Sequence, residues 1–530
     1  MPRRPLPPYI AVTLSLLIVA ATAGLWLRQY LEESKNPAAT SQNFEHANPR
    51  RLVSKTTEAV APTTESADPK DAAPGHSIPN ERVLSFAAES DYRAFLANLP
   101  DDVHVVASNQ RLLSVRIKVP ERFDPSQLPP NAQDDPNYTL LTPLPVATDT
   151  LAADRAFGSS ALRFMGALDP NNAGGQGVKI AVLDTGIRNH TTLDSDKLTQ
   201  IGFSAPHDYL SHGTAVASLI AGQEGVGIAP QAELIGIQVL DTDGIGDAFT
   251  LAKAIVQAVD EGANIINMSL GSYGTNQALS NAVAYAESQG VVLVASAGNE
   301  SVAALPYPAA YESVIAVSAI DAEGHPTSFS NQSASVDIAA PGVGVYAAWD
   351  DENWTSFTGT SAAAPYVSGA IASLSSALDI TASEAAELLL ANANDSGLPG
   401  VDVQLGRGYV DLTRSYNSNT SYTDLALADI YLAHTDGPED QYTIHLTAQN
   451  RGTETIPAAV LSYTLPNGIT QEIYLGSLEP GQSASQSLPA NVSELSLGLE
   501  ISANVVTRSY EPDTIPENNL RSSNLSIPEE

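Results

Sequence analysis

Short apolar segments alternate with alanine-rich stretches between residues 155 and 416, and this alternation restricts the possible fold more than any other feature of the chain. Apolar residues recur at helical spacing in the alanine-rich stretches. The apolar segments are almost continuous, which is typical of strands buried on both faces. They are 178–184, 232–240, 263–270, 290–298 and 313–320. Such alternation predicts an α/β fold, a parallel sheet flanked by helices, for residues 155–416.

Residues 421–525 follow a different pattern. Short runs of alternating polar and apolar residues are separated by Gly, Pro and Asn. This pattern is typical of strands in an antiparallel sandwich. We therefore expect a C-terminal all-β sandwich after the α/β domain.

Residues 1–30 contain an uncharged apolar run from Tyr9 to Leu27. A helix over this run would be about 28 Å long, close to the thickness of a bilayer core. Two arginines precede the run, so the positive-inside rule places the rest of the chain outside the cytoplasm. Residues 21–23 have the small-x-small pattern of a cleaved signal peptide, whereas Trp26 favours a membrane anchor. Either alternative exports the bulk of the chain, as an anchored or a secreted protein.

Three further segments precede the α/β region. Residues 31–80 are rich in Pro, Ser, Thr and Ala and predict a disordered linker. Residues 81–119 predict a strand, a helix and two more strands, a unit that is small for an independent domain. Residues 120–154 return to a Pro- and Asp-rich composition and predict a second linker.

Composition excludes several classes of function. The chain has 25 Lys and Arg against 60 Asp and Glu, a formal net charge of −35. This surplus repels phosphate, so we expect no nucleic-acid partner. Cysteine is absent from the 530 residues, which excludes disulfides, thiolate metal sites and a cysteine nucleophile.

Three polar residues stand at the strand ends or helix starts where a parallel sheet presents its ligands. Asp184 closes an apolar strand, His212 opens a helical stretch, and Ser361 opens another. Each alone is commonly a turn or cap residue. Together they fit nucleophilic catalysis, because a serine needs an imidazole base and the imidazole needs a carboxylate to orient it. Asn299, which ends another strand, could donate a hydrogen bond to the developing oxyanion.

These segments resemble those of the subtilisin-like serine proteases, or subtilases. The motifs D-T-G, H-G-T-x-V-A, A-G-N and G-T-S-x-A-x-P occur in the family's order within residues 155–416. The resemblance implies that Asp184 orients His212 and that His212 acts as general base and then acid. It also implies that Ser361 is the nucleophile and Asn299 the oxyanion donor. The implied activity is hydrolysis of peptide bonds in proteins through an acyl-enzyme.

The resemblance also assigns the backbone that pairs with an extended substrate and the pocket for the residue before the cleaved bond. These substrate-binding residues are Asp243, Gly244, Ser269, Leu270, Gly271, Ala297 and Gly298. Their lining is mostly apolar, with Glu300 near the rim. It predicts a preference for large apolar side chains with some tolerance of Lys or Arg.

The sequence departs from the family's pattern at a few positions. Ala215, Ala362 and Tyr366 stand where other residues are frequent, but none has a role in the triad. Residues 221–229 are too short for the calcium-binding insertion that many subtilases carry there. The acidic turn at 241–244 lacks EF-hand ligands. We therefore expect no required cofactor and identify no metal site, while calcium binding stays open.

The flanking segments carry weaker resemblances. Residues 81–119 resemble the end of a subtilase propeptide, which assists folding and inhibits the enzyme; a structural spacer is the alternative. Residues 421–525 resemble bacterial adhesion-related sandwich domains through the motifs at 450–453, 478–481 and 516–519. Such a domain either targets the enzyme to a surface or substrate, or only stabilises it.

Two alternatives to a subtilase stay open. A non-catalytic adhesion or binding protein could be built on the same fold, although no member of the triad is missing. The acid-active sedolisins are disfavoured by the H-G-T motif. The expected partners are protein or peptide substrates and, through the N-terminal helix, a membrane; the chain is expected to be a monomer.

Overall fold

The structure is a computed structural model that describes residues 75–143, 155–167, 174–202, 211–350, 352–435, 441–465, 468–490, 495, 499–508 and 512–525. The chain divides into two units, Met1–Glu65 and Ser66–Glu530, and all described residues belong to the second. The predicted apolar helix at 9–27 and most of the linker at 31–80 lie outside the described residues. Among the described helices, none is long and apolar enough to cross a bilayer.

The central sheet confirms the predicted α/β fold. Within the described residues it has seven parallel strands in the order β12-β11-β10-β9-β5-β7-β6. The strands are β5 (Lys179–Asp184), β6 (Leu198–Ile201), β7 (Glu233–Gln238), β9 (Ile265–Met268), β10 (Val292–Ser296), β11 (Val314–Ile320) and β12 (Ile338–Pro341).

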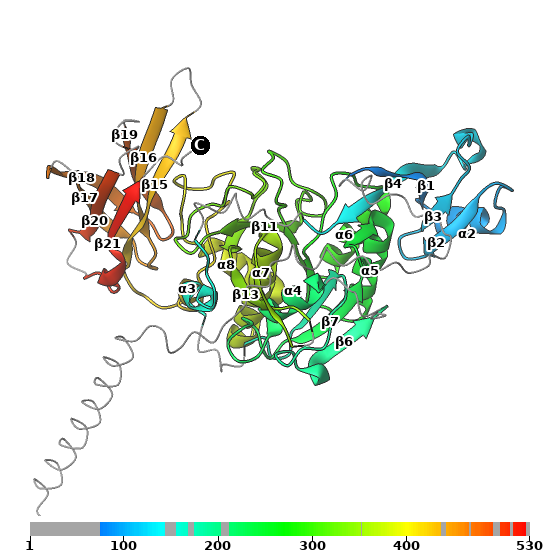
Figure 1. Ribbon diagram of the computed structural model, residues 1–530, viewed down its shortest axis with the longest axis horizontal. Helices are drawn as coiled ribbons and strands as arrows, with labels where there is room; N and C mark the ends of the chain where they lie inside the picture. The colour runs from blue at the N-terminus through cyan, green and yellow to red at the C-terminus, as the bar shows by residue number, and fades with distance from the viewer. Residues whose placement is uncertain are drawn as a thin grey trace, which may run out of the picture. The chain divides into compact units, whose positions relative to one another are not determined.

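Helices cover both faces of this sheet (Figure 1). On one face lie α4 (His212–Ala221), α7 (Thr360–Leu378) and α8 (Ala382–Ala391), and on the other α5 (Ala248–Asp260) and α6 (Gln277–Ser288). Alternate residues of β5 enter different cores: Ile180 and Val182 face the first group of helices, Ala181 and Leu183 the second. The continuous apolar strands follow from this two-sided burial. Smaller elements are the helices α3 (Ala161–Phe164) and α9 (Leu412–Tyr416), the hairpin β13 (Val345–Ala348) and β14 (Trp354–Phe357), and the 3-10 turns η3 (Pro125–Gln127), η4 (Ser195–Lys197) and η5 (Pro516–Asn518).

The C-terminal region confirms the predicted β-sandwich. One sheet contains β15 (Leu425–Thr435), β16 (Gln441–Asn450) and β19 (Ser483–Ala490). The other contains β17 (Ile456–Thr464), β18 (Thr470–Leu478), β20 (Leu499–Thr507) and β21 (Leu520–Leu525). Side chains from both sheets share one apolar core.

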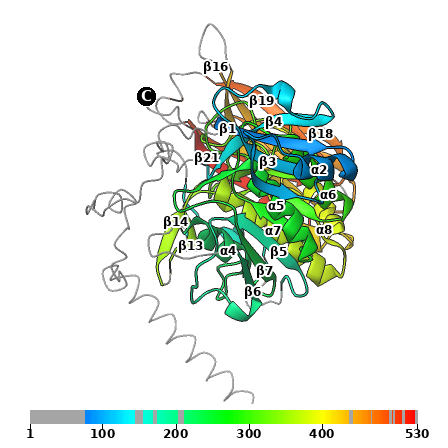
Figure 2. The same ribbon diagram turned by 90° about the vertical axis from the view of Figure 1, so that its right-hand side faces the viewer.

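An antiparallel sheet precedes the α/β domain, and we call residues 77–141 the N-terminal β-unit. Its elements are β1 (Ser77–Phe86), α2 (Glu89–Ala97), β2 (His104–Asn109), β3 (Ser114–Lys118) and β4 (Ala132–Leu141). The sheet order β2-β3-β1-β4-β8 ends on β8 (Ile245–Asp247), a strand of the α/β domain. Figures 1 and 2 both show β1 and β4 beside α5 and α6.

The strand β4 lies in a range whose composition predicts a linker. Its acidic residues find specific partners: Asp134 pairs with Arg82 of β1, and Asp135 accepts a hydrogen bond from the backbone N–H of Gln277. Tertiary contacts therefore hold a turn-like sequence in an extended conformation.

Candidate active site

Asp184 and His212 meet at the carboxyl end of β5. Asp184 is the last residue of that strand and fully buried, and His212 is the first residue of α4. The His212 Nδ1 lies 2.9 Å from each carboxylate oxygen of Asp184. The ring of Phe357 stands edge-on to the imidazole at 5.3 Å. These contacts fix the orientation of the ring and direct Nε2 away from the carboxylate.

A glycine permits this close approach of α4 to β5. A Cβ at Gly213 would lie 2.3 Å from the Gly186 carbonyl oxygen and 3.2 Å from the Asp184 carboxylate. The Gly213 N–H also donates to the hydroxyl of Thr185 at 3.1 Å. Gly213 of the H-G-T motif and Thr185 of the D-T-G motif therefore have roles in packing α4 against β5.

Ser361 lies in the first turn of α7. Pro365, inside the same helix, lacks the N–H that would normally bond to the Ser361 carbonyl. That carbonyl instead accepts a hydrogen bond from the hydroxyl of Ser269, at 3.2 Å. One of the predicted substrate-binding residues thus fixes the backbone of the serine segment.

Two polar atoms of this site are buried without a hydrogen-bond partner among the described residues: Nε2 of His212 and Oγ of Ser361. Buried polar atoms are normally paired. Among the described residues, the imidazole nitrogen of His212 and the hydroxyl of Ser361 therefore keep their hydrogen-bonding capacity for another group.

Asn299 is oriented by the first residue of α7. Its Oδ1 accepts from both the N–H and the hydroxyl of Thr360, each at 2.9 Å. Its Nδ2 lies beside Gly359, where a Cβ would come within 2.7 Å of that nitrogen. The φ of Gly359 is +141°, which also favours glycine. The amide donor therefore lies near the N-terminus of α7, the helix whose second residue is Ser361.

The N-terminal β-unit pairs with the two backbone segments that the family resemblance predicts to bind substrate. Leu141 exchanges two backbone hydrogen bonds with Gly271, at 3.0 and 2.9 Å. On the other side Leu141 pairs with Ile245 of β8, and the Thr142 N–H donates to the Gly244 carbonyl at 3.1 Å. Residues 139–142 thus form the middle strand between two segments of the α/β domain.

The other predicted substrate-binding residues have different surroundings. Leu270 is fully buried and belongs to the core, while Asp243 is an exposed residue of a turn whose N–H donates to Asp241. Ala297 and Gly298 contribute their carbonyl oxygens, which accept hydrogen bonds from Asn331. Sequence analysis did not identify Asn331, because no motif marks it and its partners lie about thirty residues away along the chain.

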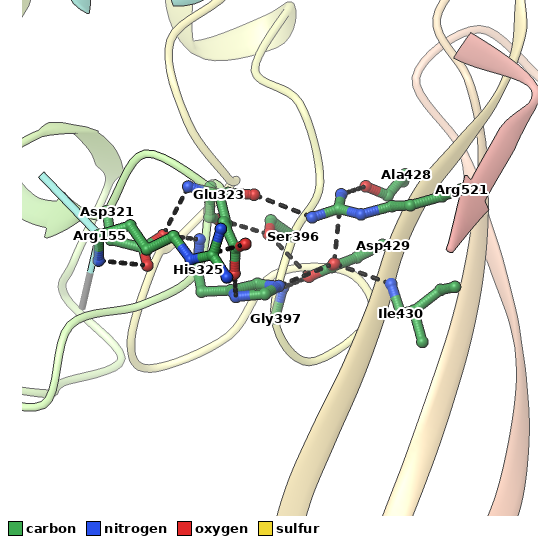
Figure 3. A network of polar contacts seen from close by, with 11 residues as sticks. Arg155, Asp321, Glu323, His325, Ser396, Gly397, Ala428, Asp429, Ile430 and Arg521 are labelled. Atoms are coloured by element: carbon green, nitrogen blue, oxygen red, sulfur yellow. Dashed lines mark hydrogen bonds and ion pairs between the residues drawn. The ribbon is translucent and has the colours of Figure 1, made fainter. Parts of the chain in front are cut away.

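One group of residues has the donor types of a metal site: Asp321, Glu323 and His325 (Figure 3). Their polar atoms already have protein partners. The Asp321 carboxylate accepts from the backbone N–H groups of Arg155, Glu323 and His325 at 2.9–3.1 Å, and Arg155 pairs with Glu323 at 3.0 Å. His325 Nε2 lies 3.3 Å from Asp429 of the β-sandwich. With a guanidinium among them, these residues do not fit a cation site.

The same residues join the sandwich to the α/β domain. Asp429 is fully buried and accepts from the Ser396 hydroxyl and the Gly397 N–H, both at 2.9 Å. Arg521 lies 3.3 Å from Asp429 and also donates to the carbonyl of Glu323. Figure 3 shows these contacts converging on Asp429. This network is a structural junction between the domains.

An aspartate–histidine pair at the end of a parallel strand, with a serine in the first turn of a helix that packs against the helix of the histidine, is an arrangement typical of serine hydrolases. Comparison with known proteins narrows the class. Residues 175–408 match the model of the subtilase family, peptidase S8. The chain is 40% identical over 204 residues to subtilisin BL of Lederbergia lenta, covering 37% of this chain and 76% of that protein. This chain therefore belongs to the subtilase family of serine-type endopeptidases.

Two further similarities show how much of this chain resembles known proteins. A thermostable alkaline protease of Halalkalibacterium halodurans is 38% identical over 219 residues, which cover 40% of this chain and 61% of that protein. The solved structure of fervidolysin from Fervidobacterium pennivorans, described as a keratinolytic enzyme related to subtilisin, has a TM-score of 0.55 at 21% identity. It covers 85% of this chain and 76% of fervidolysin, so the likeness of fold extends beyond the α/β domain.

Proposed function

We propose that this chain is an exported serine endopeptidase in which Asp184, His212 and Ser361 form the catalytic triad. The observation that carries the proposal is the bond from His212 Nδ1 to the Asp184 carboxylate, together with the unpaired Nε2 of His212 and Oγ of Ser361. The carboxylate stabilises the tautomer in which Nε2 is free to accept a proton.

In the proposed reaction His212 Nε2 takes the proton of Ser361 Oγ as that oxygen attacks the substrate carbonyl. The oxyanion accepts hydrogen bonds from the Asn299 amide and from a backbone N–H at the start of α7, where the helix dipole adds a favourable field. His212 then protonates the leaving amine, which departs. The acyl-enzyme is hydrolysed by a water that His212 deprotonates, and the proton returns to Ser361.

The position of residues 139–142 supports binding of substrate by strand addition. An extended peptide in their place would pair with β8 on one side and with Gly271 on the other. Backbone pairing of this kind accepts many sequences, so we propose unfolded or flexible protein segments as substrates.

The N-terminal β-unit would then be an inhibitory propeptide. Its last residue, Leu141, and the adjoining Thr142 occupy the proposed substrate groove. It also caps two helices, because Asp135 accepts from the first N–H of α6 and the side-chain oxygen of Asn137 accepts from Phe249 N–H in the first turn of α5. A unit that completes helix N-termini would assist folding as well as block the groove.

We propose export on the apolar run at 9–27, either as an anchor or as a cleaved signal, and a supporting role for the sandwich. Its buried polar junction at Asp429 favours a fixed position on the α/β domain over a free targeting module.

The test is reaction of the full-length chain with a fluorophosphonate, which labels activated serines. Wild type and Ser373→Ala should be labelled at neutral pH, and Ser361→Ala should not. Ser373 is a suitable control because it lies on the same helix, with its hydroxyl bonded to Tyr416. Mass spectrometry should also show loss of an N-terminal piece ending between residues 143 and 155, absent in Ser361→Ala. Equal labelling of Ser361→Ala and wild type would refute the proposal.

A further inference from the structure

Glu300 follows Asn299 directly, and its carboxylate is held by three donors. Its Oε2 accepts hydrogen bonds from the Asn299 backbone N–H at 3.0 Å, from the Tyr273 hydroxyl at 3.0 Å and from the Asn331 amide at 2.8 Å. Hydrogen bonds to an ionised carboxylate are among the stronger ones in proteins. Oε2 of Glu300 is therefore directed toward these protein donors.

Asn331 holds this arrangement in place through several hydrogen bonds. It is fully buried, and its amide also donates to the Ala297 carbonyl at 2.9 Å. Its side-chain oxygen accepts from the N–H groups of Glu300 and Val302, both at 3.1 Å. The side chain of Asn331 thus forms hydrogen bonds along the segment from Ala297 to Val302.

The carboxylate packs against a residue that lines the proposed pocket. Gly298 has a φ of +97°, and a Cβ there would lie 2.2 Å from the Asn331 amide nitrogen and 2.7 Å from Glu300 Oε2. The side chains of Glu300 and Asn331 therefore fill the space beside Gly298 that a larger residue would need.

Tyr273 reaches Glu300 from the opposite segment of backbone. It follows Gly271, which pairs with Leu141, by only two residues. The hydrogen bond between Tyr273 and Glu300 consequently joins the 269–273 segment to the 297–300 segment. Burial and the neighbouring Glu300 charge raise the pKa of Tyr273, so its hydroxyl stays protonated and donates at any pH where the enzyme would work.

We propose that Tyr273 determines the substrate preference of this site by engaging the Glu300 carboxylate. With its Oε2 already bonded to Tyr273, Asn331 and the Asn299 N–H, the carboxylate is less available to a basic side chain, and the pocket between residues 269–271 and 297–298 takes an apolar side chain in preference to Lys or Arg. This inference rests on the proposed endopeptidase function. It narrows the sequence-based expectation, which allowed some tolerance of basic residues.

The test compares two peptide anilides that differ only in Leu or Lys before the cleaved bond, with the full-length chain after any self-processing. In Tyr273→Phe the carboxylate loses one donor and becomes available to a basic side chain. The ratio of kcat/KM for the Lys peptide to that for the Leu peptide should rise by up to about fivefold, the largest factor expected of one exposed ion pair. The double variant Tyr273→Phe, Glu300→Gln should lose this gain.

Tyr311→Phe is the matched control, because its hydroxyl bonds to Thr275 in the same neighbourhood and not to Glu300. It should leave the Lys-to-Leu ratio unchanged. A ratio unaltered by Tyr273→Phe, or a rise that persists in the double variant, would overturn the inference while cleavage itself continues. Absence of both cleavage and fluorophosphonate labelling in folded wild type would instead overturn the proposed function on which it rests.

Discussion

Arg116 of β3 lies 2.7 Å from Asp247, the residue whose carboxylate caps α5 of the α/β domain. Its guanidinium also pairs with Glu81 at 2.7 Å, and Asn137 donates to both Glu81 and Asp247. All the side chains of this cluster are largely shielded from water. The N-terminal β-unit is therefore joined to the start of α5 by this charged cluster, in addition to the pairing of β4 with β8.

The first prediction concerns this cluster. In the Ser361→Ala background, which should not process itself, Arg116→Met leaves two carboxylates without a cationic partner in a largely buried site. Losing one partner of such a group costs up to about 3–5 kcal/mol. We expect the N-terminal β-unit to be digested at least tenfold faster in limited proteolysis, followed by mass spectrometry.

Arg93→Met is the control for that experiment. Arg93 pairs with Glu89 on the exposed surface of α2, where water screens the ion pair and its loss changes stability little. Similar digestion of both variants would show that the Arg116 cluster does not hold the unit in place.

The second prediction concerns Gly359. An alanine there would push against the Asn299 amide, so Gly359→Ala should lower kcat nearly as much as Asn299→Ala does. Loss of one oxyanion donor costs about 10²–10³-fold in kcat, a range measured on subtilisin, the namesake of this family. KM for a peptide substrate should change little, because the donor acts mainly in the transition state.

Gly400→Ala separates this effect from backbone strain. Gly400 also has a positive φ, of +82°, but no atom lies within 4 Å of the position of its Cβ. It should lose stability without a comparable fall in kcat. If Gly359→Ala kept full kcat, Asn299 would not be the donor that we propose.

The sequence predicted the parallel sheet and the sandwich because these depend on periodic patterns that each segment carries by itself. The polar motifs also singled out Asp184 and His212, which are in contact in the structure, and Asn299, which bonds to the first residue of α7. The sequence alone could not predict β4, because Asp134 and Asp135 favour a turn until Arg82 and the N-terminus of α6 are in place.

The same limit applies to the residues around the pocket. Tyr273 and Asn331 stand in no motif, and their hydrogen bonds to Glu300 join segments that are separated by 27 and 31 residues. Only the folded chain shows that the carboxylate of Glu300 is engaged. The prediction that the pocket tolerates Lys or Arg considered the charge of Glu300 but not the groups that bond to its carboxylate.

The third prediction concerns pH and the junction at Asp429. Burial alone would lower the pKa of His325, but the hydrogen bond and charge of Asp429 outweigh it and raise the pKa above its ordinary value. Burial would raise the pKa of Asp429, but His325 and Arg521 outweigh it and lower the pKa to about 2. Protonated His325 therefore stabilises the junction at acid pH, and this contribution is lost as the pH rises through its folded pKa. The contribution of Asp429 is lost only as the pH falls below about 4 towards 2.

We expect the unfolding temperature of the C-terminal sandwich to fall between pH 5.5 and 8.5, and to fall less in His325→Gln, which carries no titrating charge. Calorimetry on the full-length chain measures both values. His104→Gln, at an exposed position of β2, should behave like wild type. If His325→Gln showed the same dependence on pH as wild type, the His325–Asp429 pair would not couple the two domains, and the junction would depend on Arg521, Ser396 and Gly397 alone.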